Sequence, residues 1–164
     1  MKRKILAITL SVIMLFSIPT IAFAADNKAD STLSNDIEIM PISTFWDIAS
    51  LGQYTGSFVG VRSFVDTACY FKPNSSGRLS VKVVSSWKYH EDSSFNPGIT
   101  IQIKNMSGTV VKSYNFSNSI GTNKYSFTGL SSNSTYYVTV KMRSTDSVGK
   151  NTISGTIYVR HSAY

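Results

Sequence analysis

The sequence predicts an all-β protein, a two-layer antiparallel β-sandwich of about eight strands. From Ile37 onward the chain consists of short segments rich in Val, Ile, Thr, Tyr and Phe, residue types that favour strands. Clusters of Gly, Ser, Asn and Pro separate these segments at intervals of roughly ten residues. No stretch of helix length shows the apolar period of about 3.6 residues typical of a helix. Because strands that each bury one face need a second sheet to cover them, a sandwich is the economical solution.

Residues 1–24 have the three-part pattern of a secretory signal peptide. Basic residues occupy positions 2–4, an apolar run covers 5–21, and positions 22–24 read Ala-Phe-Ala. An uncleaved membrane anchor is the alternative, because the run approaches the roughly 20 residues that span a bilayer. The Ala-x-Ala end favours cleavage after Ala24, and hence a secreted, extracellular protein with no stable membrane anchor after cleavage.

The sequence predicts a disordered leader at residues 25–40 and a single β-sandwich domain at residues 41–164. The leader is polar, without periodicity, and mostly acidic; its charged residues are Asp26, Lys28, Asp30, Asp36 and Glu38. Polar segments of this kind cannot bury enough apolar surface to fold. The only cysteine is Cys69, so no disulfide can form within the chain and the domain must be stabilised by packing.

The charge of the chain is basic, with 16 Lys and Arg against 9 Asp and Glu and a formal net charge of +7 at pH 7. Removal of the signal peptide would lower that charge to +4. A modest basic excess outside the cell favours attraction to anionic polymers, so we expect a cell-wall or extracellular glycan, or another anionic polymer, as the partner. The alternative is that the lysines serve solubility and protect sheet edges. We expect no nucleic-acid partner, because that would require more aromatic rings and more charge.

Alternation of apolar and polar residues locates the strands. Between Leu79 and Tyr89 the odd positions are mostly apolar, which turns Trp87 and Tyr89 toward the core and His90 toward the other face. Between 136 and 143 the same period sends Tyr136, Val138, Val140 and Met142 inward. The remaining predicted strands are near 56–64, 66–71, 99–104, 110–116 and 124–128, with a last strand that buries Ile153, Ile157 and Val159.

Turn chemistry separates the predicted strands, and one segment could form a helical turn. Reversals are expected at 73–77, 96–98, 105–108, 121–123 and 131–134, which are rich in Gly, Pro, Asn and Ser. The helical turn, if formed, lies within TFWDIASL at 44–51.

The order Gly77-Arg78-Leu79-Ser80-Val81, Ile99-Thr100-Ile101-Gln102-Ile103, Gly108-Thr109-Val110-Val111 and Tyr136-Tyr137-Val138-Thr139-Val140 resembles the bacterial pre-peptidase C-terminal type of domain. That family is a small β-sandwich attached to secreted enzymes. The stretch LSSNSTYYVTV at 130–140 is similar to the late strands of fibronectin type III domains. Both resemblances cover about residues 65–160 and rest on hydrophobic spacing and turn residues. The chain departs from the pre-peptidase pattern at Asn96-Pro97-Gly98, where acidic residues are common in that family, and it has no protease domain to serve.

The stretch SSWKYHEDSS at 85–94 is the one place where groups of catalytic or metal-binding type gather. His90 could act as the base of a small hydrolase, since a base is required in hydrolytic triads and His161 stands near the chain end, where fraying is expected. A zinc site is not favoured, because a strand sends His90 and Glu91 to opposite faces. Glu91 and Asp92, with the carbonyl groups of 93–96, are weak calcium ligands, and a solvated turn is the alternative.

Other reactive groups do not form a pattern. Cys69 is expected to be a buried small hydrophobe, because no electropositive neighbour is visible to lower its pKa. The scattered Asp47, Asp66 and Asp146 do not suggest a catalytic pair of carboxylates. No phosphate-binding glycine loop is present. We therefore predict no catalytic residue, no bound metal and no cofactor.

Outward-facing aromatic residues are the remaining candidates for a binding site. Tyr137 shares its predicted face with Lys141 and Arg143, and an exposed ring beside cations could bind an anionic glycan. Trp46 and Tyr54 are secondary candidates, and a solvated sheet face is the alternative. The leading functional hypothesis is a secreted, non-catalytic binding protein. The alternatives are a small extracellular hydrolase that uses His90, and a self-associating matrix or toxin-like protein with exposed strand edges. The sequence leaves the oligomeric state open.

Overall fold

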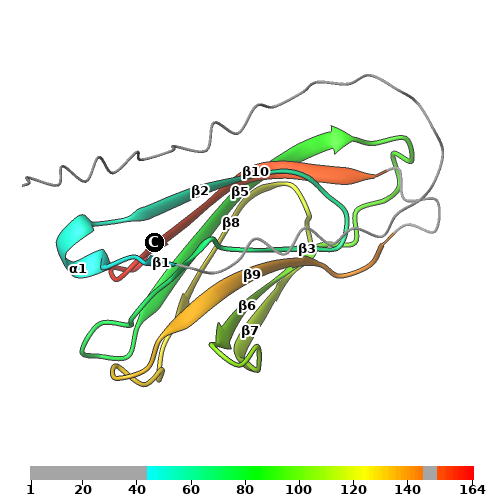
Figure 1. Ribbon diagram of the computed structural model, residues 1–164. Coiled ribbons are helices and arrows are strands. Elements are labelled where there is room, and N and C mark those ends of the chain that lie inside the picture. The colour runs from blue at the N-terminus through cyan, green and yellow to red at the C-terminus, as the bar shows by residue number, and fades with distance from the viewer. Residues whose placement is uncertain (1–43, 146–150) are drawn as a thin grey trace, which may run out of the picture. The chain divides into compact units, whose positions relative to one another are not determined.

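The structure is a computed structural model that describes residues 44–145 and 151–164. The predicted signal peptide (1–24) and leader (25–40) lie outside the described residues, as does Asp146. Two four-stranded antiparallel sheets form two layers, one with strand order β2-β10-β5-β8 and the other with order β3-β9-β6-β7 (Figure 1). The prediction of an all-β antiparallel sandwich is confirmed.

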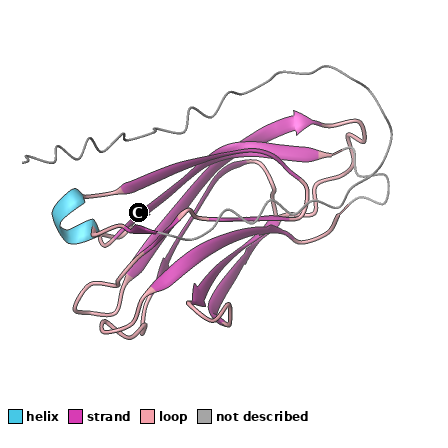
Figure 2. Ribbon diagram, in the orientation of Figure 1, coloured by secondary structure: helices cyan, strands magenta, loops and turns pink. Residues whose placement is uncertain are grey.

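The first sheet consists of β2 (Tyr54–Val61), β5 (Leu79–Tyr89), β8 (Gly121–Phe127) and β10 (Thr152–Arg160). The second sheet consists of β3 (Phe64–Asp66), β6 (Ile99–Asn105), β7 (Val110–Phe116) and β9 (Tyr136–Met142). The short strands β1 (Thr44–Phe45) and β4 (Cys69–Tyr70) form a separate parallel pair. Between β1 and β2 lies a single helical turn, α1 (Ile48–Leu51), within the segment for which the sequence allowed one (Figure 2).

The core lies between the two sheets and is built from the side chains that alternation predicts to point inward. Ile99, Ile101 and Ile103 of β6 are fully buried, and so are Val81 and Val83 of β5. The predicted inward residues of β9 are also buried, with Val140 1% exposed. Each such aliphatic side chain contributes about 1.5–3 kcal/mol when it leaves water, so packing between the sheets stabilises a domain that has no disulfide.

The alternation predicted for the end of β5 is wrong after Trp87. Ile153 of β10 pairs with Trp87, whereas the preceding Thr152 pairs with Tyr89, so Lys88 is an extra residue in β5. Such a bulge reverses the faces of the residues beyond it. Trp87 packs against the core as expected, but Tyr89 points outward and is 62% exposed.

Two turn and strand predictions need correction near the sheet edges. The predicted turn at 121–123 is the beginning of β8, where Gly121 takes a positive φ of 88° and then pairs with Ser85. The predicted strand at 56–64 is divided between the two sheets, because β2 ends at Val61 and β3 begins at Phe64. Both the start of β8 and the division between β2 and β3 depend on which strand each segment pairs with, and the local sequence does not show this pairing.

Candidate functional site

The outer face of the first sheet carries basic and hydroxyl side chains. Its four strands contain no Asp or Glu, and their basic residues are Lys82, Lys88, Lys124 and Arg160. Because Val81 and Val83 are fully buried, the intervening Lys82 points to the outer face. Directly paired residues share a face, and the register places four of them in one row across the sheet: Thr55, Tyr158, Lys82 and Lys124.

Two tyrosine rings hold two of these cations at one end of the face. The Nζ atom of Lys82 lies 4.1 Å from the ring centroid of Tyr158 and 5.4 Å from that of Tyr164. The guanidinium carbon of Arg160 lies 3.6 Å from the ring centroid of Tyr164. These distances are within the range of cation–π attraction, which extends to about 6 Å. We call Lys82, Lys124, Tyr158, Arg160 and Tyr164 the cation–tyrosine cluster.

Lys82 and Lys124 are direct cross-strand partners on β5 and β8. Like charges placed directly opposite each other destabilise a sheet, and the four strands of this sheet supply no carboxylate to compensate them. The Lys82 ammonium is directed toward Tyr158 on the other neighbouring strand, β10. The two lysines therefore add positive charge to the same outer face from two adjacent strands.

Hydroxyl groups extend the same face beyond the cluster. The row next to Lys82 and Lys124 contains the hydroxyl residues Ser57, Thr156 and Thr122, with Val84 between the last two. A hydroxyl can both donate and accept a hydrogen bond, so these side chains can satisfy the hydroxyl groups of a polymer that lies along the sheet.

The last four residues are fixed against the domain, which corrects the expectation of a frayed end at His161. The Nε atom of Arg160 donates to the Ser162 carbonyl at 3.1 Å, and its Nη2 atom donates to the Ala163 carbonyl. The Tyr164 hydroxyl donates to Oε1 of Gln53 at 3.2 Å. Burial raises the pKa of Tyr164, with the Arg160 charge acting in the opposite direction. The ring of Tyr164 is thus part of the cluster because the tail is held in place.

The predicted binding residues Tyr137, Lys141 and Arg143 are only partly arranged as expected. Lys141 is exposed on the outer face of β9, and Arg143 is exposed just beyond its end. The ring of Tyr137, however, is only 7% exposed, so it cannot stack on a ligand as predicted. Its cross-strand partner Lys104 lies with Nζ 5.8 Å from the ring centroid. Burial, and secondarily the charge of Asp66, raises the pKa of Tyr137.

The secondary aromatic candidates are also incorrect. Tyr54 is 7% exposed and belongs to the core cluster, and Trp46 packs against that cluster. The indole Nε1 of Trp46 donates to the Gly52 carbonyl at 3.1 Å. The prediction that both rings face outward failed because the local sequence around Trp46 and Tyr54 does not show which strands pack beside it.

The bulge at Lys88 turns His90 toward Trp87 and the Phe95 main chain, where the imidazole makes packing and hydrogen-bond contacts. Its ring stacks on the indole of Trp87, with centroids 4.1 Å apart and planes 8° apart. Its Nε2 atom lies 3.1 Å from the Phe95 carbonyl oxygen, which accepts the hydrogen bond. The placement of His90 on the outer face was therefore wrong. The contacts of the imidazole are an aromatic ring and a main-chain carbonyl, and this arrangement gives the hydrolase hypothesis no support.

The calcium candidates lie in an exposed turn. Oδ1 of Asp92 accepts hydrogen bonds from the Ser94 amide at 2.9 Å and from the Ser94 hydroxyl at 2.6 Å. Glu91 is exposed beside it. Within residues 44–145 and 151–164, no three His, Cys, Asp or Glu side chains are grouped so that they could hold a metal ion. Calcium binding by Glu91 and Asp92 stays a prediction.

Alternation alone could have shown that two residues of the cluster face outward. The last strand was predicted to bury Ile157 and Val159, which implies that Tyr158 and Arg160 face outward. What the sequence could not supply is the lateral order of the strands, which places Lys82 beside Tyr158.

Comparisons with known proteins do not assign a family. No protein-family model matches the chain, and no curated protein matches it. Among solved structures, the chain is similar to the crystal structure of Aeromonas hydrophila PliG, a periplasmic lysozyme inhibitor of g-type lysozyme. The TM-score is 0.33 and the identity 14%, over 66% of this chain and 82% of that chain. In the part of the chain that the structure describes, no helix is long and apolar enough to cross a membrane.

Proposed function

We propose that the protein is a secreted, non-catalytic binding protein for anionic polysaccharides. The observation that carries this proposal is the outer face of the first sheet, where Lys82 and Lys124 oppose each other without a carboxylate on any of the four strands. Charge of one sign on one face attracts polymers of the opposite sign. The face is also rich in hydroxyl groups, which a neutral apolar partner would leave without hydrogen bonds.

The chemistry of the face favours a polysaccharide over a nucleic acid. Proteins that bind single-stranded nucleic acid stack successive bases on free aromatic rings. Here the rings of Tyr158 and Tyr164 are engaged by Lys82 and Arg160. A polysaccharide needs no such stacking, because its acidic groups contact the cations and its hydroxyl groups contact Ser and Thr side chains.

Calorimetric titration with polygalacturonate, dextran and single-stranded DNA tests the proposal. We expect polygalacturonate to bind, and to bind more weakly as salt is raised, because salt screens exposed charges over about 10 Å at 0.1 M. Dextran, which has no charge, should not bind. Equal affinity for dextran, or tighter binding of DNA than of polygalacturonate, would contradict the proposed ligand class.

Charge reversal locates the binding face. Lys82→Glu and Lys124→Glu should each lower the affinity for polygalacturonate by about tenfold, equivalent to about 1.4 kcal/mol. Lys141→Glu is the matched control, because it makes the same charge change on the outer face of the second sheet. An equal loss in all three variants would show that only net charge matters and that the face is wrongly assigned.

A further inference from the structure

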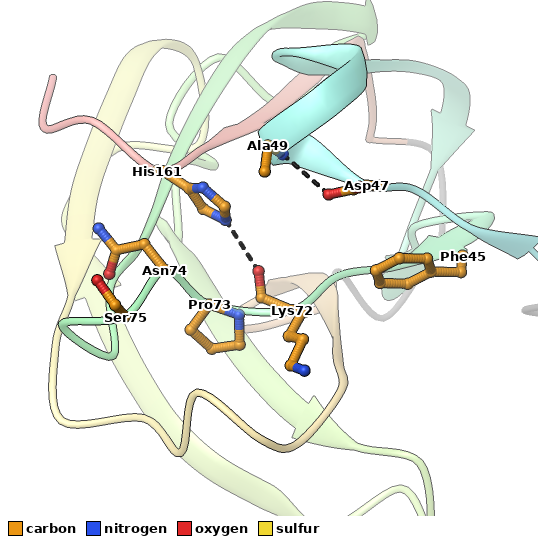
Figure 3. Close-up of a pocket in the computed structure, with 8 residues that line it drawn as sticks. All are labelled: Phe45, Asp47, Ala49, Lys72, Pro73, Asn74, Ser75 and His161. Atoms are coloured by element: carbon orange, nitrogen blue, oxygen red, sulfur yellow. Dashed lines mark hydrogen bonds between the residues drawn. The ribbon is translucent and has the colours of Figure 1, made fainter.

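A surface pocket of about 520 Å³ lies beside the C-terminal tail (Figure 3). Three segments line it: the region of β1 and α1, the loop at 72–75, and the C-terminal tail. Its volume is in the range of about 300–1,000 Å³ that is usual for small-molecule sites. The pocket is therefore large enough for a ligand of the size of a sugar.

The pocket is joined to the cation–tyrosine cluster through the C-terminal tail, because the chain passes directly from one to the other. Arg160, the last residue of β10, belongs to the cluster, and the next residue, His161, lines the pocket. The ring Nε2 of His161 lies 2.9 Å from the Lys72 carbonyl oxygen, which accepts the hydrogen bond (Figure 3). This bond joins the tail to the loop that forms one side of the pocket.

The wall of the pocket contains groups that both donate and accept hydrogen bonds. Asp47 accepts from the Ala49 amide at 3.0 Å through Oδ1 and from the Ser50 hydroxyl at 2.7 Å through Oδ2. An ionised carboxylate has about four lone-pair sites, so Asp47 keeps acceptor capacity beyond these bonds. Oδ1 of Asn74 accepts from the main-chain amides of Ser76 and Arg78, which fixes the loop that forms one side of the pocket.

An aromatic side chain completes the lining. Phe45 is 40% exposed, which is high for a ring of this size, and it packs at a tilt on Tyr70 with centroids 5.5 Å apart. An exposed ring beside hydrogen-bonding groups presents an apolar surface and a polar surface together. A sugar ring has the same two surfaces, formed by its C–H groups and its hydroxyl groups.

The charges of the pocket differ from those of the cluster. Asp47 and Lys72 carry opposite unit charges and both line the pocket. Hydrogen bonds from Ser50 and Ala49 lower the pKa of Asp47, so its carboxylate is ionised at neutral pH. The charges of Asp47 and Lys72 therefore cancel within the lining, in contrast to the cationic face.

We propose that this pocket binds one neutral sugar unit of the polysaccharide whose acidic units lie on the cation–tyrosine cluster. The inference rests on the proposed function and adds a second subsite to it. The cluster supplies attraction to the charged polymer, and the pocket selects a polymer that contains an uncharged sugar at the right distance. Phe45 contacts the C–H face of the sugar, and Asp47 binds its hydroxyl groups.

Amide chemical-shift mapping of the full chain with neutral trisaccharides tests the pocket by itself. Maltotriose, cellotriose and chitotriose carry no charge, so the cationic face contributes little to their binding. We expect at least one of them to shift the signals of Phe45, Asp47 and Asn74. Phe45→Ala should weaken that binding by about tenfold. Leu51→Ala is the matched control, because Leu51 is 61% exposed on α1 and does not line the pocket.

The outcomes separate this inference from the proposed function. Absence of shifts with all three trisaccharides, or shifts that persist in Phe45→Ala, overturns the pocket even if polygalacturonate binds the cluster. Trisaccharide binding that is insensitive to Lys82→Glu supports the separate subsite. If trisaccharides bind but polygalacturonate does not, the pocket is a sugar site. The binding role of the cluster, and with it the two-subsite arrangement, is then refuted.

Discussion

The rings of Tyr114 and Tyr125 stack face to face, with centroids 3.8 Å apart and planes 17° apart. The two residues belong to β7 and β8, which are edge strands of different sheets. Each ring also meets a phenylalanine of its own strand edge-on, Phe116 and Phe127 respectively, at 4.9 Å. This row of four rings joins the two layers along one side of the sandwich.

Tyr114→Ala and Tyr125→Ala should each destabilise the domain, and their effects should not be additive. A double-mutant cycle from urea unfolding is expected to give a coupling of about 1 kcal/mol, the usual value for an aromatic pair. Additive losses within the error of the measurement would show that the stack does not connect the sheets energetically.

Gly98→Ala should lower the free energy of unfolding by about 3 kcal/mol. Gly98 has a φ of 80°, and an added Cβ would overlap the carbonyl oxygen of Phe116. Gly121 is the matched control, since its φ is 88° but an added Cβ meets nothing within 4 Å. Gly121→Ala should cost only the backbone strain of about 1–2 kcal/mol. Equal losses in urea unfolding would exclude the overlap as the cause.

Asp47→Asn should make stability less sensitive to acid. The pKa of Asp47 in the folded chain lies below its ordinary value of 3.8, chiefly because the Ser50 hydroxyl and the Ala49 amide donate to it. The unfolded chain therefore takes up the proton first as the pH falls, so the stabilisation is present above that value and disappears below it. Urea unfolding at several pH values should show the difference between wild type and Asp47→Asn shrinking in acid. A constant difference would contradict the role of the charge.

Tyr137→Phe should reduce the loss of stability in alkali. Burial, followed by the charge of Asp66, raises the pKa of Tyr137 above its ordinary value of 10.0. Above that pH the unfolded chain loses the phenolic proton before the folded chain does, so the stabilisation present below pH 10.0 is lost as the pH rises. Unfolding measured on both sides of this pH should show a smaller decline in the variant, and an identical decline would show that Tyr137 titrates normally.

Tyr164→Ala should weaken polygalacturonate binding by about threefold, because it removes the ring that holds Lys82 and Arg160. Tyr164→Phe keeps the ring and loses only the hydrogen bond to Gln53, so it should bind nearly as well as wild type. Calorimetric titration separates the two effects. If Tyr164→Phe binds as weakly as Tyr164→Ala, the hydroxyl rather than the ring is responsible.

Sequence patterns predicted the strands more reliably than the site. Alternation identified the buried residues of β6 and β9, because each strand must present one apolar face to the core whichever strand is its neighbour. The same reasoning failed at Tyr89 and Tyr137. At Tyr89 an extra residue in β5 reverses the alternation. At Tyr137 the outward position is occupied as expected, but the residue is buried there, with Nζ of Lys104 on the adjacent strand 5.8 Å from the ring centroid.

The sequence by itself determined that the chain forms an all-β sandwich, since periodicity and turn residues are properties of neighbouring positions. It also determined that Lys82 lies on a polar strand position between inward apolar residues. Only the tertiary structure decided that β5 lies between β8 and β10, which brings Lys82 against both Lys124 and Tyr158. It also decided that the tail returns to Gln53 and Lys72. Lateral strand order and tail docking depend on contacts between residues far apart in the chain, and no local pattern encodes them.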